Sequence, residues 1–183
     1  MDLTDDILTF WFSDGPVEDR AVWFKPDPDF DREIKARFAD AAGRAAAGEL
    51  DGMAETARGA LALIILLDQM PRNLYRGDAR AFAADGKALA VAEAAIAHGL
   101  DAQMNWAERM FLYMPYQHAE DLAVQDRSVE LFALLGRPST LEFAQKHRDI
   151  VARFGRFPHR NADLGRLSTA DEQAFLTEHG RGF

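Results

Sequence analysis

Cysteine is absent from this sequence of 183 residues. Without a thiol, the chain can form no disulfide, bind no metal through cysteine sulfur and carry out no thiol catalysis. Proline is also scarce, with seven residues, whereas alanine is abundant. This balance favours helices, because alanine has the highest helix propensity of all residues and proline the lowest.

Long hydrophobic runs are absent as well. The longest apolar run extends over eight residues, from Ala60 to Leu67, whereas a helix that crosses a bilayer needs about 20. The sequence begins Met1-Asp2-Leu3-Thr4-Asp5-Asp6, which lacks the basic region of a secretory signal. We therefore expect a soluble cytoplasmic protein that does not bind membranes.

Positive charge is in short supply. The chain has 21 Lys and Arg residues against 30 Asp and Glu residues, which gives a net charge of −9. This excess of acids argues against a nucleic-acid-binding protein, because phosphates must be neutralised by a basic face. The hydrophobic content of 48% is typical of a folded protein, and the length predicts a single domain over residues 1–183.

Helical periodicity dominates what the sequence does contain. Phe30, Ile34 and Phe38 recur at helical spacing. They predict a helix that begins near Pro28 and ends at Gly48. No stretch alternates apolar and polar residues for long enough to predict a strand. The predicted fold is all-α, with seven or eight helices packed as antiparallel hairpins or as a bundle.

A central buried helix is predicted over residues 51–70, because its second half is apolar on all sides. Pro71 disfavours helical geometry at Met70, so we expect the helix to end there, with Asp68 in its last turn. A carboxylate at that position opposes the helix dipole and therefore needs a cationic partner such as Arg72.

Capping residues mark several helix starts. Asp78 is predicted to cap a helix that turns Asp85 toward the core. Capping boxes predict three further starts, at Asn105-x-x-Glu108, Ser139-x-x-Glu142 and Thr169-x-x-Glu172. The helix that follows Ser139 carries His147 on its apolar stripe and is expected to end at Gly155.

The segment from Lys146 to Arg160 reverses the overall charge balance. It contains five Lys or Arg residues and one acidic residue, a local charge of +4 in a chain of −9. It contributes to three polar clusters that we expect at helix ends, where a helical protein can gather them around one cavity. The clusters consist of Asp68, Arg72 and Asn73; of His118 and Glu120; and of His147, Arg153, Arg156, His159, Arg160 and Asn161.

Three interpretations of these clusters remain open. Arginine side chains that form bidentate pairs could hold the carboxylate or phosphate of a small anionic ligand, beside a histidine that transfers protons. Alternatively, the arginines neutralise buried acids such as Asp68 and satisfy helix ends, so that the segment is a structural clamp. A metal site is the third interpretation, but the spacing around His118 matches no zinc motif. We therefore predict no metal and no cofactor.

Three motifs resemble those of a known family, in the same order. They are Leu66-Leu67-Asp68-Gln69-Met70-Pro71-Arg72-Asn73, Met114-Pro115-Tyr116-Gln117-His118-Ala119-Glu120-Asp121 and Arg153-Phe154-Gly155-Arg156-Phe157-Pro158-His159-Arg160-Asn161. With Phe10-Trp11-Phe12 and Trp23-Phe24, they make the chain similar over its full length to the bacterial domain-of-unknown-function family 924. Ala119 departs from the pattern, since a Ser usually follows the histidine. The resemblance implies an all-helical, tetratricopeptide-like fold, no established activity, and motif positions that include all residues of the three clusters.

The preferred hypothesis is a binding site for a small anionic ligand, with or without catalysis. In this hypothesis Arg72, Arg156 and Arg160 hold the charge of the ligand. His118 or His159 serves as acid or base. The alternative is a helical-hairpin scaffold that binds a peptide or protein in a concave groove and has no catalytic activity. Inward convergence of the clusters favours the first hypothesis, and display along one face favours the second. The sequence does not predict the oligomeric state.

Overall fold

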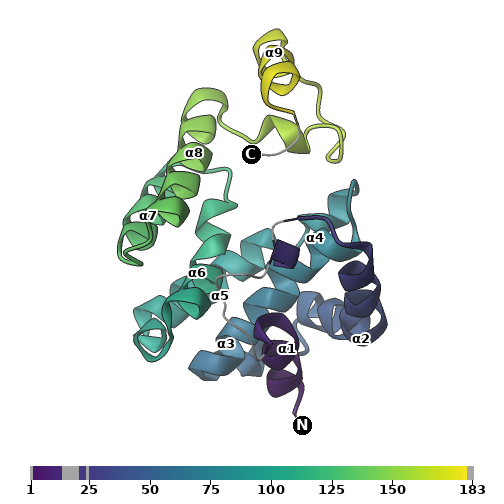
Figure 1. Ribbon diagram of the computed structural model, residues 1–183, viewed down its shortest axis with the longest axis vertical. Coiled ribbons are helices and arrows are strands. Elements are labelled where there is room, and N and C mark those ends of the chain that lie inside the picture. The colour runs from purple at the N-terminus through teal and green to yellow at the C-terminus, as the bar shows by residue number, and fades with distance from the viewer. Residues whose placement is uncertain (1, 14–20, 24, 181–183) are drawn as a thin grey trace. The chain divides into compact units, whose positions relative to one another are not determined.

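The computed structural model describes residues 2–13, 21–23 and 25–180 (Figure 1), so Phe24 of the aromatic motif lies outside the described residues. The described residues form helices and no strand. The α-helices are α1 (Leu3–Phe12), α2 (Pro28–Ala47), α3 (Ala57–Ile64), α4 (Met70–Leu74), α5 (Asp85–Ala97), α6 (Trp106–Gln117), α7 (Leu122–Ala133), α8 (Pro138–Phe154) and α9 (Ala170–His179). Short 3₁₀ helices occupy Ala21–Trp23, Asp51–Glu55, Ala79–Ala81, Leu100–Gln103 and Pro158–Arg160.

One turn of π-helix, Ile65–Gln69, joins α3 to α4 without a break. The nine α-helical segments of the described residues therefore form eight rods. This architecture confirms the predicted all-α class and the predicted number of helices. None of the helices among the described residues is both long and apolar enough to span a membrane.

The chain divides into two compact units. Unit 1 comprises Met1–Arg76 and Arg80–Pro115, and unit 2 comprises Gly77–Ala79 and Tyr116–Phe183. The boundary falls inside α6, whose last two residues belong to unit 2.

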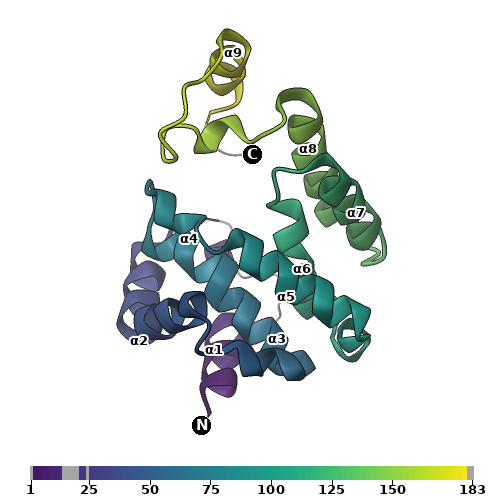
Figure 2. The ribbon, with the colours of Figure 1, turned by 180° about the vertical axis from the view of Figure 1, so that it is seen from behind.

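Unit 1 is built around the rod formed by α3, the π turn (Ile65–Gln69) and α4. Helices α1, α2 and α5 pack against this rod, as the two opposite views in Figures 1 and 2 show. Leu63, Ile64 and Leu66 in the rod are fully buried. The predicted burial of the central helix is thus confirmed, because a helix that is apolar on all sides must be covered on all sides. Its predicted start at residue 51 was wrong, since Asp51–Glu55 is a 3₁₀ helix and Thr56 caps α3 by accepting from the N–H of Gly59.

The prediction that Pro71 ends this helix was wrong. Met70 has helical dihedral angles, with φ −60° and ψ −35°, and its N–H bonds to the carbonyl of Ile65. That bond spans five residues instead of four and widens the turn just before the proline. Because Pro71 lacks an N–H, it fits best in the first turn of a helical segment, and the wider turn places it in the first turn of α4.

Two predicted helix starts were also wrong. The helix assigned to a cap at Asp78 begins at Asp85, after a 3₁₀ helix, and an acid in this first turn is favoured by the helix dipole. Helix α8 begins at Pro138 and not after Ser139, since the fixed φ of proline suits a first helical position. Glu142 consequently forms no capping box and instead pairs with Lys146 at 2.7 Å.

The other two capping boxes are confirmed. The N–H of Asn105 donates to Glu108, and the N–H of Glu108 donates to Asn105, at 2.9 and 3.1 Å. Thr169 and Glu172 form the same reciprocal pair at the start of α9. The predicted end of α2 is confirmed as well, because Gly48 takes the left-handed conformation there.

Unit 2 consists of a hairpin of α7 and α8, followed by the irregular segment that leads to α9. Asp121 caps α7 by accepting from the N–H of Val124 at 3.0 Å. Ile150 and Val151 at the end of α8 pack with Phe157 in the small core of this unit. Because Phe157 follows the end of α8, this packing fixes the turn that carries most of the predicted polar residues.

Candidate functional site

The first predicted cluster lies in unit 1, where Arg72 bridges two carboxylates. Its Nη1 and Nη2 donate hydrogen bonds of 2.9 Å to Asp85, and Nη1 lies 3.3 Å from Oδ1 of Asp68. Asp68 is fully buried, so its charge requires such a partner. Burial lowers the pKa of Arg72, but the charges of Asp68 and Asp85 outweigh burial and raise it. The charge of Arg72 is therefore neutralised by carboxylates of the protein itself.

The remaining polar residues of this motif also bond within unit 1. Asn73 donates to Oδ1 of Asp31 at 2.7 Å, and Arg76 donates to both oxygens of the same carboxylate at 2.8 and 3.0 Å. Burial raises the pKa of Asp31, but the hydrogen bonds from Arg76 and Asn73 outweigh burial and lower it. Gln69 donates to Oδ2 of Asp68 at 2.5 Å. Since Asp31 belongs to α2, these bonds join α4 to α2.

In unit 2, His118 follows the last residue of α6. The buried side chain of Gln125, on α7, donates from Nε2 to the carbonyl oxygens of Gln117 and Ala119, at 2.7 and 2.8 Å. These two carbonyls lie on either side of His118 in the chain. A single amide thus fixes the backbone of the loop on both sides of the histidine.

The turn after α8 is held by an ion pair. Gly155, with φ 70°, ends α8 in the left-handed conformation. Glu120 accepts from the N–H of Phe157 at 2.8 Å, and both of its oxygens accept from Arg166, at 2.6 and 2.9 Å. Arg166 also donates to the carbonyl of Phe157 at 3.1 Å. Burial raises the pKa of Glu120, but the bonds from Arg166 and Phe157 outweigh burial and lower it.

Glu172, which is 2% exposed, is the second anchor of this turn. Nε and Nη2 of Arg156 donate to its two oxygens at 2.6 and 2.8 Å. Asn161 and the N–H of Thr169 donate to Oε2 at 3.2 and 2.7 Å. The bonds from Arg156 lower the pKa of Glu172 to about 2, against the effect of burial. Arg156 and Asn161 therefore clamp the turn to the start of α9.

Two histidines and one arginine lie against the buried ring of Phe157, and a third histidine lies beside one of them. His147 meets this ring edge-on, with centroids 5.5 Å apart and planes at 74°, and His159 lies against it at 5.5 Å. Cζ of Arg160 lies 4.7 Å from the centre of the same ring. The rings of His118 and His147 are 6.4 Å apart. We refer to His118, His147, His159 and Arg160 as the His–Arg cluster.

His147 is the neutral member of this cluster. Its Nδ1 lies 2.8 Å from the carbonyl oxygen of Phe143, which can only accept, so Nδ1 carries the proton. Burial lowers the pKa of His147 to about 3, although the bond to Phe143 opposes this effect. The charge of Arg160, and those of His118 and His159 when they are protonated, lower it further. The potential at the centre of the cluster is therefore most positive at a pH at which these two histidines carry a proton.

The chain matches a known protein family and a solved structure. Residues 7–180 match the family described as "Bacterial protein of unknown function (DUF924)". The chain belongs to this family. It is similar to the solved structure of a protein of unknown function, ATU0120 from Agrobacterium tumefaciens, with 45% sequence identity and a TM-score of 0.89 over 96% of this chain and 97% of that chain. Among proteins with curated descriptions, none matches the chain.

In this member of the DUF924 family, the predicted site residues fall into distinct groups. The His–Arg cluster brings four of them together. Glu120, Arg156 and Asn161 lie beside it and hold its backbone, whereas Asp68, Arg72 and Asn73 lie in unit 1. Arg153 is exposed at the end of α8, where its Cζ lies 4.6 Å from the ring centre of Phe154.

Sequence patterns missed two residues that support the cluster in this DUF924 protein. The first is Gln125, which is buried on the same face of α7 as Ser128 and Leu131. A polar residue on the apolar stripe of a helix was an available signal for it. Arg166 lies in a segment without helical periodicity, and no sequence signal distinguished it from the other arginines.

The structure offers no arrangement for a metal centre within the part of the chain that it describes. No three His, Asp or Glu side chains among residues 2–13, 21–23 and 25–180 are placed to hold one ion. Within the His–Arg cluster, His147 and His159 lie against the ring of Phe157, and His118 lies beside His147. Arg160 and the ring of Phe157 are buried, whereas the three histidines of the cluster are partly exposed.

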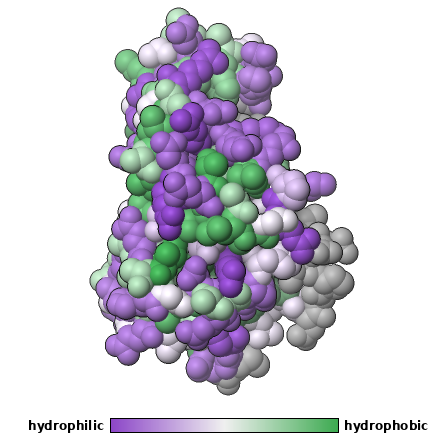
Figure 3. Space-filling view, turned by 90° about the vertical axis from the view of Figure 1, so that its left-hand side faces the viewer, coloured by the Kyte–Doolittle hydropathy of each residue, from purple (hydrophilic) through white to green (hydrophobic). Residues whose placement is uncertain are grey.

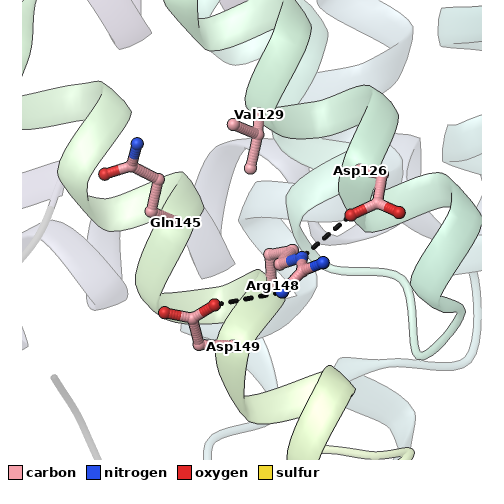
Figure 4. A pocket seen from close by; sticks show the side chains of 5 residues that line it. All are labelled: Asp126, Val129, Gln145, Arg148 and Asp149. Atoms are coloured by element: carbon pink, nitrogen blue, oxygen red, sulfur yellow. Dashed lines mark hydrogen bonds and ion pairs between the residues drawn. The ribbon is translucent and has the colours of Figure 1, made fainter.

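A groove of about 380 Å³ lies between α7 and α8 (Figure 4). Arg148 crosses it, donating to Asp126 at 2.8 Å and to Asp149 at 3.4 Å. The polar residue Gln145 and the apolar residue Val129 complete its lining. On the face drawn in Figure 3, hydrophobic residues are likewise interspersed with hydrophilic ones. The α7–α8 groove is thus mostly polar, with its charges already paired.

Proposed function

We propose that this protein binds a small molecule through an anionic group, a carboxylate or a phosphate, at the His–Arg cluster. The observation that carries the proposal is that Arg160, His147 and His159 lie against the ring of Phe157, with His118 beside His147. Burial lowers the pKa of His147, and Arg160 together with His118 and His159 in their protonated forms lowers it further, which corresponds to a positive potential at its ring. An anion that enters this potential is stabilised by it.

Arg160 supplies the permanent charge of the proposed site. Its guanidinium stacks on Phe157, which orients the planar fork that suits carboxylate and phosphate groups. Arg72 and Arg156 are not part of the proposed site, because both hold carboxylates of the protein in bidentate pairs. The effect of Arg160 on Glu120, in contrast, is a coulombic one. In the proposed site, the negative charge of the ligand is therefore balanced by Arg160 and by any protonated histidine beside it.

His118 and His159 are the proposed acid–base groups. The ordinary pKa of histidine, about 6.5, allows both proton donation and proton acceptance near neutral pH. His147 differs, since its low pKa keeps it neutral, and it offers the ligand a hydrogen-bonding ring without a charge. If the protein catalyses a reaction, we propose that it is one in which protons move to or from an anionic substrate.

The test is a thermal-shift and calorimetric titration with inorganic phosphate, succinate and short acidic peptides. A ligand present at about 100 times its Kd stabilises the folded state by about 2.7 kcal/mol, which is a measurable shift. We expect phosphate or succinate to stabilise the parent protein. This stabilisation should be lost in His118→Ala and His159→Ala.

Arg153→Ala is the matched control. It removes a positive charge from the same segment, but Arg153 is exposed and stacks on Phe154 outside the cluster. The control should keep the full ligand response. Equal loss of the response in all three variants would show a general charge effect and would contradict the proposed site, and so would a parent protein that none of the small anions stabilises.

The alternative hypothesis, a scaffold that grips a peptide in a groove, has less support. Helical scaffolds that bind peptides offer a continuous apolar groove. The groove between α7 and α8 is instead mostly polar and is crossed by the ion pairs of Arg148. Stabilisation by the acidic peptides alone would favour this alternative over the His–Arg cluster.

A further inference from the structure

Gln125 is a polar residue in an otherwise apolar environment. Its side chain is fully buried on α7, together with Leu131 and Phe132 on the same helix. A buried amide is costly unless its polar atoms are bonded, so its position calls for a physical reason. That reason lies in the loop between α6 and α7, because both donor hydrogens of Nε2 serve carbonyls of this loop.

The bonds of Gln125 enclose a single residue. The carbonyls of Gln117 and Ala119 precede and follow His118, and each lies within 2.8 Å of Nε2. Gln125 thus holds the peptide group before His118. The N–H of Ala119, in the peptide group after this histidine, bonds to the carbonyl of Tyr116, so the direction of the Cα–Cβ bond of His118 is fixed. The acceptor atom Oε1 of Gln125 has no hydrogen-bond partner among the described residues. The amide is therefore oriented by its two donor contacts.

We infer that Gln125 is a positioning residue, which holds His118 in place toward His147 within the His–Arg cluster. The centroid distance of 6.4 Å between these two rings depends on the loop after α6, which Glu120 also ties to the turn after α8. The bond from Ala119 N–H to the carbonyl of Tyr116, at 3.3 Å, is the adjoining turn contact. The functional part of this inference rests on the proposed anion site, whereas the positioning of His118 does not.

The experiment compares Gln125→Met with the parent protein. Methionine matches glutamine in length and suits a buried site, but it cannot donate to either carbonyl. We expect the NMR signals of the His118 ring to shift and its titration midpoint to move, because the ring leaves its fixed place among the charges of the cluster. Affinity for inorganic phosphate should fall about tenfold, as when an outer-shell partner of a binding residue is lost.

Two control variants separate positioning from general stability. Ser128→Ala alters a side chain on α7 that is as deeply buried as Gln125, and Leu131→Ala opens a cavity in the same helix. Both should leave the His118 signals in place, even where they lower the melting temperature. The ring signals of His98, which lies in unit 1, serve as a reference in every sample.

The outcomes distinguish the two ideas. If Gln125→Met only lowers the melting temperature and leaves the His118 signals unchanged, Gln125 is a structural cap and the inference is overturned. If the parent protein does not bind phosphate, the proposed function fails, but the NMR comparison still decides the role of Gln125. If Gln125→Met does not fold, Gln125→Asn replaces it, since the shorter amide is uncharged and cannot reach both carbonyls.

Discussion

Arg166 binds both oxygens of Glu120 across 46 residues of sequence, and the backbone of Phe157 lies between them. Glu120 accepts the N–H of Phe157, and Arg166 donates to its carbonyl. The pair thereby ties the loop after α6 to the turn after α8. His118 lies on this loop and His159 lies on this turn, so the ion pair sets the frame in which the proposed acid–base residues stand.

Removal of Arg166 should destabilise the protein. In Arg166→Met, the partly buried carboxylate of Glu120 keeps only its backbone donor, and we expect the free energy of unfolding to fall by about 2 kcal/mol. Urea denaturation measures this change. Arg153→Met, an exposed arginine at the end of α8, should stay within about 0.5 kcal/mol of the parent. A double-mutant cycle with Glu120→Gln should show coupling, and strict additivity would contradict the structural role of the pair.

Stability should decrease in acid because of Glu172. Its pKa in the folded state is about 2, whereas the ordinary value is 4.5. As the pH falls below about 4.5, Glu172 becomes protonated in the unfolded chain. In the folded chain it stays ionised until about pH 2, so its contribution to the free energy of unfolding is lost between these two values. Glu172→Gln removes this part of the pH dependence. Unfolding curves of parent and variant that stay parallel from pH 5 to pH 2.5 would contradict the prediction.

His147 should remain neutral throughout the physiological range. Its folded-state pKa of about 3 lies below the ordinary value of 6.5, so the unfolded chain binds a proton first as the pH falls. The contribution of His147 to stability is therefore complete above about pH 6.5 and is lost as the pH falls toward 3. In NMR titrations its ring signals should stay constant from pH 8 to pH 4.5, with the proton on Nδ1. A titration midpoint above pH 5 would contradict the buried, positively surrounded position.

Two helical glycines should respond to alanine in opposite directions. A Cβ on Gly59, in the first turn of α3, would collide with the backbone carbonyl of Met53, so Gly59→Ala should cost about 1–3 kcal/mol. A Cβ on Gly43, in α2, would meet no atom within 4 Å. Gly43→Ala should therefore stabilise the protein by about 0.5–1 kcal/mol, since alanine is the better helix former. Thermal unfolding of the two variants, prepared side by side, measures both signs.

The helical architecture followed from local patterns. The spacing of Phe30, Ile34 and Phe38 and the glycine at position 48 predicted α2 because a helix start, its buried face and its end are all encoded within a few residues. The errors at Pro71 and Pro138 have one physical cause. Each proline sits in the first turn of a helix, where its missing N–H has no cost, and the sequence does not show where that first turn falls.

The candidate site was less accessible to sequence reasoning. Residue type alone marked His118, His147, His159 and Arg160, because few side chains other than arginine and histidine combine positive charge with directed donors. The pairings could not be predicted in the same way. Arg156 binds an acid 16 residues away and Arg166 binds one 46 residues away, among 30 acidic residues in the chain. Such choices depend on how the turn after α8 folds back, which no local pattern describes.

The π turn between α3 and α4 acts as a phase shift in a continuous rod. One residue of an α-helix turns the chain by about 100°, so the extra residue within Ile65–Gln69 rotates everything after it by that angle. Arg72 and Asn73 face Asp85 and Asp31 only in this rotated phase. If the same residues formed an ordinary α-helix without the wide turn, both side chains would point away from their partners. The polar face of α4 is therefore set by the number of residues in the turn as much as by their identity.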